Sequence, residues 1–311
     1  MKVVGRSHGK FILLGEHFVV HGGVAALAFP MKDLTCEVTI VPDTVPMYRA
    51  EVPNTPERDI VENVMARAVY IAADCFRVDI KGQPIRVESK TNFPVSRGFG
   101  SSAAFAVALA RAFDEYRTEV AKVRADWMEI ERAVSAIETL FHGNPSGVDA
   151  ATILAGRPIR YENRAVVREV QNKALDFVAI DSGLRENSAP LIARITEFKH
   201  KNLDRWTEMT NELKTAIDNA EQGLNYGDAA VVVESIRKSQ GILSELGLSN
   251  ETIDALIYEA CANGALAGKV SGAGGGGAVI LAAPRTKGRE LAARMTERGY
   301  SVLGIEHGES A

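Results

Sequence analysis

The chain of 311 residues has few cysteines and no strong excess of charge. Cys36, Cys75 and Cys261 lie far apart and form no Cys-x-x-Cys pair, so a structural zinc site is not expected. An odd number of cysteines fits the reducing conditions of a cytoplasm. The net charge of −4 and the isoelectric point of about 5.9 argue against a protein held to nucleic acid by a basic surface.

Long hydrophobic runs are also missing. No apolar stretch is long enough to span a bilayer, and residues 1–10 carry charges and glycines where a signal peptide would be apolar. We therefore expect a cytoplasmic protein that binds neither membranes nor nucleic acid. The remaining composition, 46% hydrophobic and 24% charged, is that of a globular protein. The length suits two domains, and we place the boundary between residues 172 and 173.

Residues 94–104, Pro-Val-Ser-Arg-Gly-Phe-Gly-Ser-Ser-Ala-Ala, predict a glycine-rich loop that leads into a helix. Gly98 and Gly100 let the backbone approach a ligand closely, and the first amides of a helix offer a site for phosphate. Ser101 or Ser102 could place a hydroxyl on a magnesium ion, although no Walker A motif is present. A tight turn with a serine N-cap explains the same residues, so this stretch alone leaves both interpretations open.

A second glycine run, residues 272–277, has the spacing G-x-G-x-x-G but not the context of a dinucleotide site. That fingerprint needs a strand before it and a helix after it, whereas we expect a helical stretch before this run and a strand after it. We therefore expect no nicotinamide cofactor and interpret the run as a close approach to a ligand or to another loop. His17 and His21 do not suggest a metal, because the residues between them look extended and no third ligand lies nearby.

The clearest helix is expected over residues 126–141. Asp126 and Glu129 resemble a capping box, and an apolar stripe follows them, with Glu138 on its flank. The turn His-Gly-Asn-Pro-Ser-Gly then ends the helix, and Asp149 falls in the first turn of another. Residues 42–56 are expected to form a loop. Further helices are expected over 60–76, 103–117, 203–217, 231–246, 249–262 and 287–298. Strands are expected at 11–14, 36–41, 85–88, 177–180, 278–282 and 300–305.

Several charged residues have an ordinary explanation when each is taken alone. Lys10 could be a surface lysine with a buried stem, Glu16 and His17 could be turn residues, and Asp149 could favour a helix dipole. Glu138 could be a solvated flank residue. Taken together, two glycine loops, a lysine and two carboxylates beside Gly-Asn-Pro-Ser-Gly are the parts that phosphoryl transfer needs.

Four segments together resemble the GHMP small-molecule kinases, and most closely the branch that acts on mevalonate. They are residues 9–22, 94–104, 142–149 and 269–277, and the third is the most specific. The resemblance implies a two-domain α+β fold, with an N-terminal domain like ribosomal protein S5 domain 2 (1–172) and a ferredoxin-like C-terminal domain (173–311). It also implies transfer of the γ-phosphoryl group of ATP to the 5-hydroxyl of mevalonate, in the synthesis of isoprenoid precursors.

The resemblance assigns roles by position. Asp149 matches the catalytic aspartate and Lys10 the lysine that neighbours it. Substrate contacts are expected from Glu16, His17, Ser146 and Gly147, and Mg²⁺ ligands from Ser102 and Glu138. ATP contacts are expected from Pro94, Arg97, Gly98, Phe99, Gly100, Ser101, Ser102, Ala103 and Gly274. ATP and mevalonate are the expected partners, and a homodimer is left open.

Some positions depart from the family pattern. Ser7-His8 stand in place of Ala-Pro, Ser96 in place of the first loop glycine, Ala150 in place of an asparagine, and Asn187-Ser188 in place of Ser-Thr. None of these changes removes a charged catalytic group, so they bear on substrate detail and nucleotide affinity more than on reaction type. Because serine has a steric cost at positive φ, we predict an ordinary negative φ for Ser96.

Related activities remain as alternatives. Homoserine, sugar and phosphomevalonate kinases and diphosphomevalonate decarboxylase share the implied fold, and the turn at residues 142–147 argues against them. An S5-like RNA-binding module is the alternative from a different class, and the acidic isoelectric point argues against it.

Overall fold

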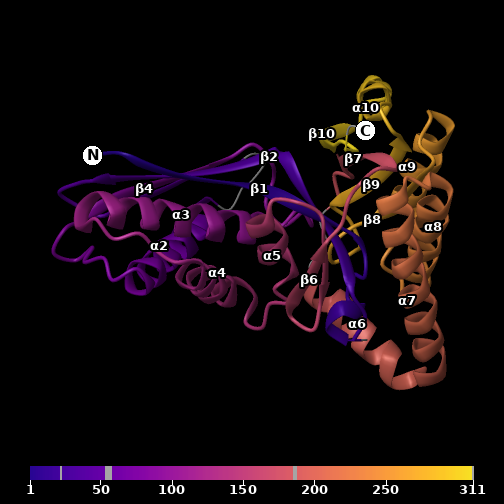
Figure 1. The fold of residues 1–311 in the computed structure, drawn as a ribbon, viewed down its shortest axis with the longest axis horizontal. Helices are drawn as coiled ribbons and strands as arrows, with labels where there is room; N and C mark the ends of the chain where they lie inside the picture. The colour runs from indigo at the N-terminus through magenta and orange to yellow at the C-terminus, as the bar shows by residue number, and fades with distance from the viewer. Residues whose placement is uncertain (22, 53–57, 185–187, 310–311) are drawn as a thin grey trace. The chain divides into compact units, whose positions relative to one another are not determined.

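The computed structural model describes residues 1–21, 23–52, 58–184 and 188–309, so Asn187 lies outside the described residues. The chain forms two compact units, each assembled from separate stretches (Figure 1). Unit 1 comprises residues 1–9, 34–95 and 100–154, and unit 2 comprises residues 10–33, 96–99 and 155–311. Strands β1 (Val3–Leu14) and β2 (Ala26–Pro42) each contribute residues to both units.

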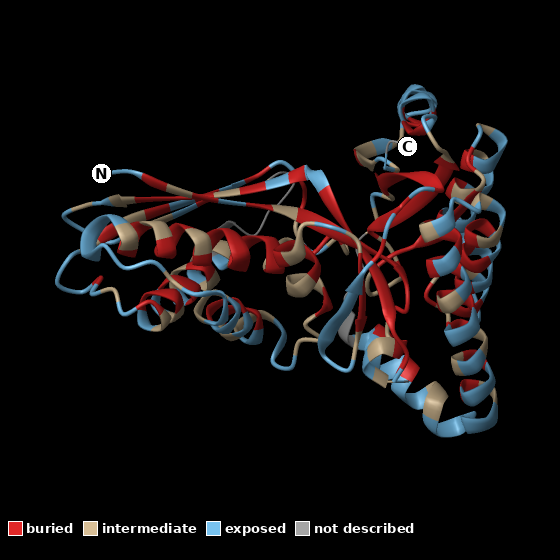
Figure 2. Cartoon of the chain, in the orientation of Figure 1, coloured by how far each residue is buried: buried red, intermediate tan, exposed pale blue. Residues whose placement is uncertain are grey.

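Unit 1 is built from strands with helices along one side (Figure 1). Strand β4 (Ile85–Thr91) pairs antiparallel with β2 and parallel with β3 (Met47–Glu51). The helices are α2 (Arg58–Cys75), α3 (Ser101–Ala121), α4 (Trp127–His142) and α5 (Val148–Ala155). Small residues let α3 approach β1, since a Cβ built on Gly5 would lie 2.0 Å from the carbonyl oxygen of Ala108. Much of α3 is therefore buried (Figure 2).

Unit 2 contains a four-stranded antiparallel sheet in the order β10-β7-β9-β8. Its strands are β7 (Leu175–Asp181), β8 (Ala267–Val270), β9 (Ala278–Pro284) and β10 (Ser301–Glu306). The two central strands, β7 and β9, are buried almost throughout (Figure 2). Two further strands, β5 (Ile159–Glu162) and β6 (Ala165–Glu169), continue from the first residues of β2.

Helices and aromatic rings complete the core of unit 2. Helix α10 (Gly288–Glu297) contacts β7, β9 and β10, while α8 (Ala229–Glu245) and α9 (Glu251–Ala262) contact β8. Helices α6 (Ser188–Lys201) and α7 (Leu203–Tyr226) precede them along the chain. The rings of Phe11, Phe29 and Phe177 cluster with centroids 5.2–5.5 Å apart. These rings join the end of β1 to β2 and β7.

Most of the expected elements are present, and the capping box at Asp126 and Glu129 is confirmed. Several local expectations are wrong. The residues between His17 and His21 form a short helix, α1 (Phe18–His21), and β3 lies inside the expected loop. Helix α6 lies outside the predicted helices, and α9, expected to start at residue 249, begins at Glu251 with Asn250 as its N-cap residue. Strand β8, not a helix, precedes the second glycine run, because pairing with β9 outweighs the weak strand preference of alanine and glycine.

Candidate active site

The glycine-rich loop ends where α3 begins, as predicted. Gly100 is the N-cap residue, with φ of 73°, and it offers no side chain to cap the helix. The first amides of a helix have no carbonyl partner within the helix. The dipole of this helix of 21 residues adds positive charge at the same point. The local structure of the loop therefore favours an anion at the start of α3.

The conformation of Ser96 corrects one expectation. Its φ is 58°, so the prediction of an ordinary negative φ is wrong. Gly98 also has positive φ, 85°, so left-handed residues begin earlier in the loop than expected. A single residue in this region costs about 1–2 kcal/mol unless it is glycine. The surrounding contacts must offset this cost.

Ser102 lies against the end of α4. The Ser102 hydroxyl oxygen is 2.9 Å from Nε2 of His142. Glu138 precedes His142 by four residues, so the two side chains share one face of α4. Glu138 is only 4% exposed, which confirms that it lies beside the apolar stripe. The two predicted metal ligands thus belong to one local arrangement, with His142 as a member that the sequence prediction did not include.

Asp149 follows a turn made of small and polar residues. Gly143 ends α4 with φ of 66°, and Gly147 has φ of 85° immediately before α5. The backbone amide of Val148 donates to the Ser146 hydroxyl over 3.4 Å. Asp149 lies in the first turn of α5 and is half-buried. Asp149 is therefore partly accessible to solvent at the start of the helix that follows the turn.

Lys10 contacts the glycine-rich loop. Its Nζ donates to the carbonyl oxygen of Gly98 over 3.1 Å, and its backbone amide donates to that of Phe99 over 2.9 Å. Lys10 is only 2% exposed, so its charge is largely removed from water. The ordinary explanation of a surface lysine is wrong. Lys10 belongs to unit 2 and Asp149 to unit 1, and their pairing stays a prediction.

Glu16 and His17 form a buried group with the strand that leads to the second glycine run. Lys269 of β8 forms an ion pair with Oε1 of Glu16. His17 Nε2 lies 3.0 Å from the carbonyl oxygen of Ala273, and that geometry makes Nε2 the N–H donor. Burial lowers the pKa of His17 to about 4, so the ring is neutral at physiological pH and its Nδ1 can accept a hydrogen bond. Lys269 is the residue here to which the sequence prediction gave no role.

The second glycine run makes the close approach to another loop that the sequence led us to expect. A Cβ on Gly272 would lie 2.8 Å from Cα of Gly98, and one on Gly277 would lie 2.6 Å from the carbonyl oxygen of Arg97. Gly274, an expected ATP contact, packs against Leu248. Glycines in the run therefore permit contact between two loops of unit 2.

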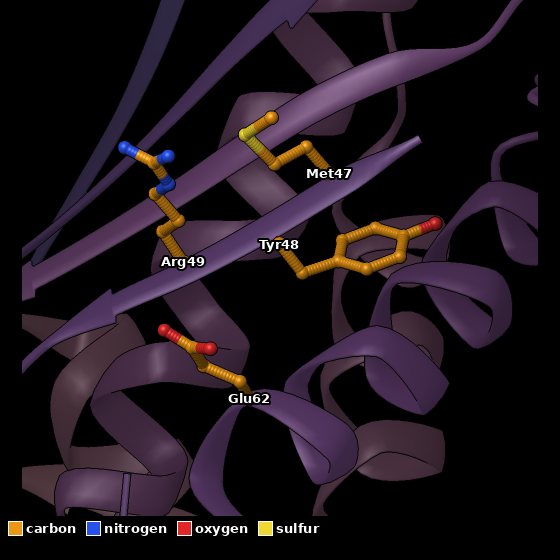
Figure 3. Close-up of a pocket in the computed structure, with 4 residues that line it drawn as sticks. All are labelled: Met47, Tyr48, Arg49 and Glu62. Carbon is orange, nitrogen blue, oxygen red and sulfur yellow. The ribbon is translucent and has the colours of Figure 1, made fainter. Parts of the chain in front are cut away.

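A pocket in unit 1 involves none of these motifs. This pocket, of about 340 Å³, is lined by Met47, Tyr48 and Arg49 of β3 and by Glu62 of α2 (Figure 3). No predicted site residue is among those four. Across the ranges that the structure describes, no three histidine, cysteine or acidic residues gather as metal ligands. No helix within those ranges has the length and apolar character needed to cross a membrane.

Comparison with known proteins identifies the family. Residues 63–157 match the family model for the GHMP kinases N terminal domain, and residues 216–301 match that for the GHMP kinases C terminal. The chain belongs to the GHMP kinase family, and the predicted fold class is confirmed. It is therefore a kinase, with the two-domain α+β fold of that family.

Several proteins similar in sequence to this chain are mevalonate kinases. The chain is 26% identical to mevalonate kinase of Methanothermobacter thermautotrophicus over 286 residues, which covers 91% of each chain. It is 28% identical to mevalonate kinase of Archaeoglobus fulgidus over 280 residues, which covers 89% of this chain and 91% of the relative. The crystal structure of L. major mevalonate kinase with R-mevalonate has a similar fold, with a TM-score of 0.85 at 22% identity, covering 100% of this chain and 97% of that one.

Proposed function

We propose that this kinase transfers the γ-phosphoryl group of ATP to the 5-hydroxyl of mevalonate, giving 5-phosphomevalonate for the synthesis of isoprenoid precursors. Curated relatives named mevalonate kinase, aligned over about nine tenths of the chain, support this substrate. The observation that carries the proposal is the contact of Ser102 with His142, one helical turn from the buried Glu138. Through this contact the Ser102 hydroxyl, at the start of α3, lies next to the face of α4 that carries Glu138.

Mg²⁺ is the cofactor in this proposal, and the chemistry of the two side chains fits it. Mg²⁺ prefers oxygen ligands, takes few of them from the protein and keeps several waters. If His142 Nε2 accepts the Ser102 proton, the hydroxyl oxygen keeps its lone pairs for the metal. Ser102 and Glu138 would hold the ion, and its positive charge would neutralise negative charge that develops during transfer.

The loop and the helix end would bind the triphosphate. Backbone groups of residues 98–103 offer amides at the N-terminus of α3, where a phosphate is stabilised by the helix dipole. Pro94 and Arg97 would shape this loop, and Gly274 would support it from the second glycine run. Lys10, whose Nζ contacts the Gly98 carbonyl, would offset negative charge on the transferred group.

Asp149 would act on the mevalonate hydroxyl. A carboxylate within hydrogen-bond reach can accept the proton that leaves as the O–P bond forms, and in a loose transition state it also orients the hydroxyl. Ser146 and Gly147 precede it and would contact the same substrate. Neutral His17 could accept a hydrogen bond at Nδ1. Oε2 of Glu16 is buried and has no hydrogen-bond partner among the described residues, which suits an acceptor for a substrate hydroxyl.

The substrate is tested by measuring ADP release with mevalonate, phosphomevalonate, homoserine and galactose as acceptors. We expect turnover with mevalonate and at most trace activity with the others. A preference for another acceptor would contradict the substrate and leave the family intact. We further propose a domain boundary at residues 172–173, between the two family-model matches, and a cytoplasmic location. The question of a homodimer stays open, and light scattering in solution would answer it.

A further inference from the structure

Arg97 lies in the middle of the glycine-rich loop, yet its guanidinium group is engaged within unit 2. Its Nε is 3.8 Å from Oδ2 of Asp181 at the end of β7. Its NH1 group donates to the carbonyl oxygen of Leu184. The two charged side chains are only 14% and 10% exposed. An ion pair with so little solvent around it is screened less by salt than one on the surface.

The segment that receives Arg97 is itself held in place. The amide of Gly183 donates to Oδ1 of Asp181 over 3.0 Å. Backbone bonds of 2.8 and 3.0 Å join Ser182 and Leu184 to Gly277. The carbonyl oxygen of Leu184 thus accepts from both Arg97 and Gly277. Residues 181–184 are therefore held to Gly277, and the Arg97 side chain contacts them.

The backbone of Arg97 makes a contact of its own beside those of the side chain. Its carbonyl oxygen accepts from the amide of Ala278 over 2.7 Å. The next residue, Gly98, has no space for a side chain, because a Cβ built on it would lie 2.7 Å from the carbonyl oxygen of Ser271. Ser96 precedes them with a left-handed conformation that serine disfavours. The loop therefore has an energetically unfavourable backbone conformation just before α3. Its contacts with Ala278 and Ser271 oppose relaxation of that conformation.

We propose that Arg97 is a positioning residue, which clamps the loop to Asp181 and Leu184 and so presets it for the phosphates of ATP. This inference rests on the proposed function of the loop. Arg97 acts through the loop and not as a phosphate ligand, because a carboxylate already balances its charge and a carbonyl takes one of its donors. The clamp keeps most molecules in the binding-competent shape. When that shape is populated only fractionally, the apparent affinity falls by the same fraction.

The test compares Arg97→Met, Asp181→Asn and the double variant by calorimetric titration with MgATP, which needs no acceptor. We expect each single variant to raise Kd about tenfold, as a competent fraction near one tenth would. The Kd of the double variant should exceed that of either single variant by no more than about a factor of two, because the effects of substituting two partners of one interaction are not additive. Arg97→Lys should recover part of the affinity, and Arg97→Met should raise KM for ATP by a larger factor than it lowers kcat. Arg157→Met is the matched control, because Arg157 pairs with Glu169 and a carbonyl on the surface.

Two results would overturn the clamp. If Arg97 binds phosphate directly, Arg97→Met weakens MgATP binding while Asp181→Asn leaves it unchanged or tighter. If neither variant shifts Kd, the ion pair has no part in nucleotide binding. Should Arg97→Met fail to fold, Asp181→Asn and Arg97→Lys decide between the same outcomes. A wild-type chain that binds MgATP but does not phosphorylate mevalonate would contradict the proposed substrate and leave the clamp result standing.

Discussion

Lys269 and Glu16 form an ion pair that is sealed from solvent, with side-chain exposures of 0% and 1%. Lys269 Nζ also donates to the carbonyl oxygen of Val270 over 2.6 Å. Burial lowers the pKa of Lys269, and the charge of Glu16 opposes that shift. The pair joins the turn after β1 to the strand before the second glycine run. It thereby holds His17 next to Ala273.

Removal of one partner should be costly. Lys269→Met leaves Glu16 as an uncompensated buried charge, and we expect a loss of about 3–5 kcal/mol in the free energy of unfolding. The double variant Lys269→Met/Glu16→Gln should recover part of that loss, because no unpaired charge remains. Chemical denaturation measures all three proteins.

Lys90→Met is the control for this pair. Lys90 bonds to Glu51 on the surface, where both side chains are about two thirds exposed, and exposed pairs contribute only about 0–1 kcal/mol. Equal losses for Lys269→Met and Lys90→Met would show that burial of the first pair has no energetic consequence.

His17 makes unfolding sensitive to mild acid. Its pKa is about 4 in the folded chain, mainly because burial disfavours the charged ring, against an ordinary value of 6.5. Between these values the unfolded chain binds a proton that the folded chain does not. The contribution of His17 is therefore complete above about pH 6.5 and is lost as the pH falls toward 4. His17 has φ of 59°, a conformation that asparagine tolerates, so we expect His17→Asn to flatten the stability profile in that window.

The exposed His200 supplies the matched control for this pH dependence. His200→Asn should leave the profile between pH 4 and 6.5 as it is in the wild type. Thermal melts across this range compare the three proteins. A His17→Asn profile parallel to that of the wild type would show that another group is responsible.

Ser96 offers a test of backbone strain. Its φ of 58° suits glycine or a small polar residue, whereas a β-branched residue there is a marked outlier. We expect Ser96→Val to lower the free energy of unfolding by about 1–2 kcal/mol more than Ser96→Gly does. Denaturation curves of the two variants measure the difference. Equal stabilities would mean that the loop relaxes to another conformation without cost.

The sequence was informative about the positions of motifs and much less so about their partners. The capping box at Asp126 is a local pattern that the structure confirms. The stripe beside Glu138 is confirmed in its middle, where Val134 and Ile137 are buried, but not at its start, where Trp127 is 55% exposed. Strand β8 was missed because Ala267 and Gly268 have weak strand preference and become a strand only by pairing with β9. Helix α1 has four residues, too few for a periodic pattern.

Partners distant in the chain could not be read from spacing. Lys269 meets Glu16 across 253 residues and Ser102 meets His142 across 40. Nothing in the local pattern marks either contact. Ser96 was assigned the wrong sign of φ because a local steric rule was applied where contacts of the surrounding loops decide the conformation. The resemblance to the family supplied the candidate roles. The residues that contact the candidates, Lys269 and His142, are brought to them by tertiary packing.

Glu138 should control the dependence on Mg²⁺. Glu138→Gln keeps the shape of a side chain that is only 4% exposed but removes its charge. We expect the Mg²⁺ concentration for half-maximal rate to rise about tenfold or more, with lower turnover and an intact fold. Glu131→Gln, at an exposed position two turns earlier on α4, is the control. An unchanged Mg²⁺ titration and rate for Glu138→Gln would remove Glu138 from the metal site.

The central claim is that Asp149 acts on the mevalonate hydroxyl, and ADP release by Asp149→Asn with mevalonate tests it most directly. Asparagine keeps the size and hydrogen bonding of the side chain but cannot accept the proton. We predict near-normal folding and MgATP binding with a rate loss of about 10²-fold or more, the scale for removal of a general base. A carboxylate that only favours the dipole of α5 would contribute about 0.3–1 kcal/mol of stability and nothing to the rate. An Asp149→Asn protein that melts earlier yet turns over within a few-fold of wild type would contradict the account.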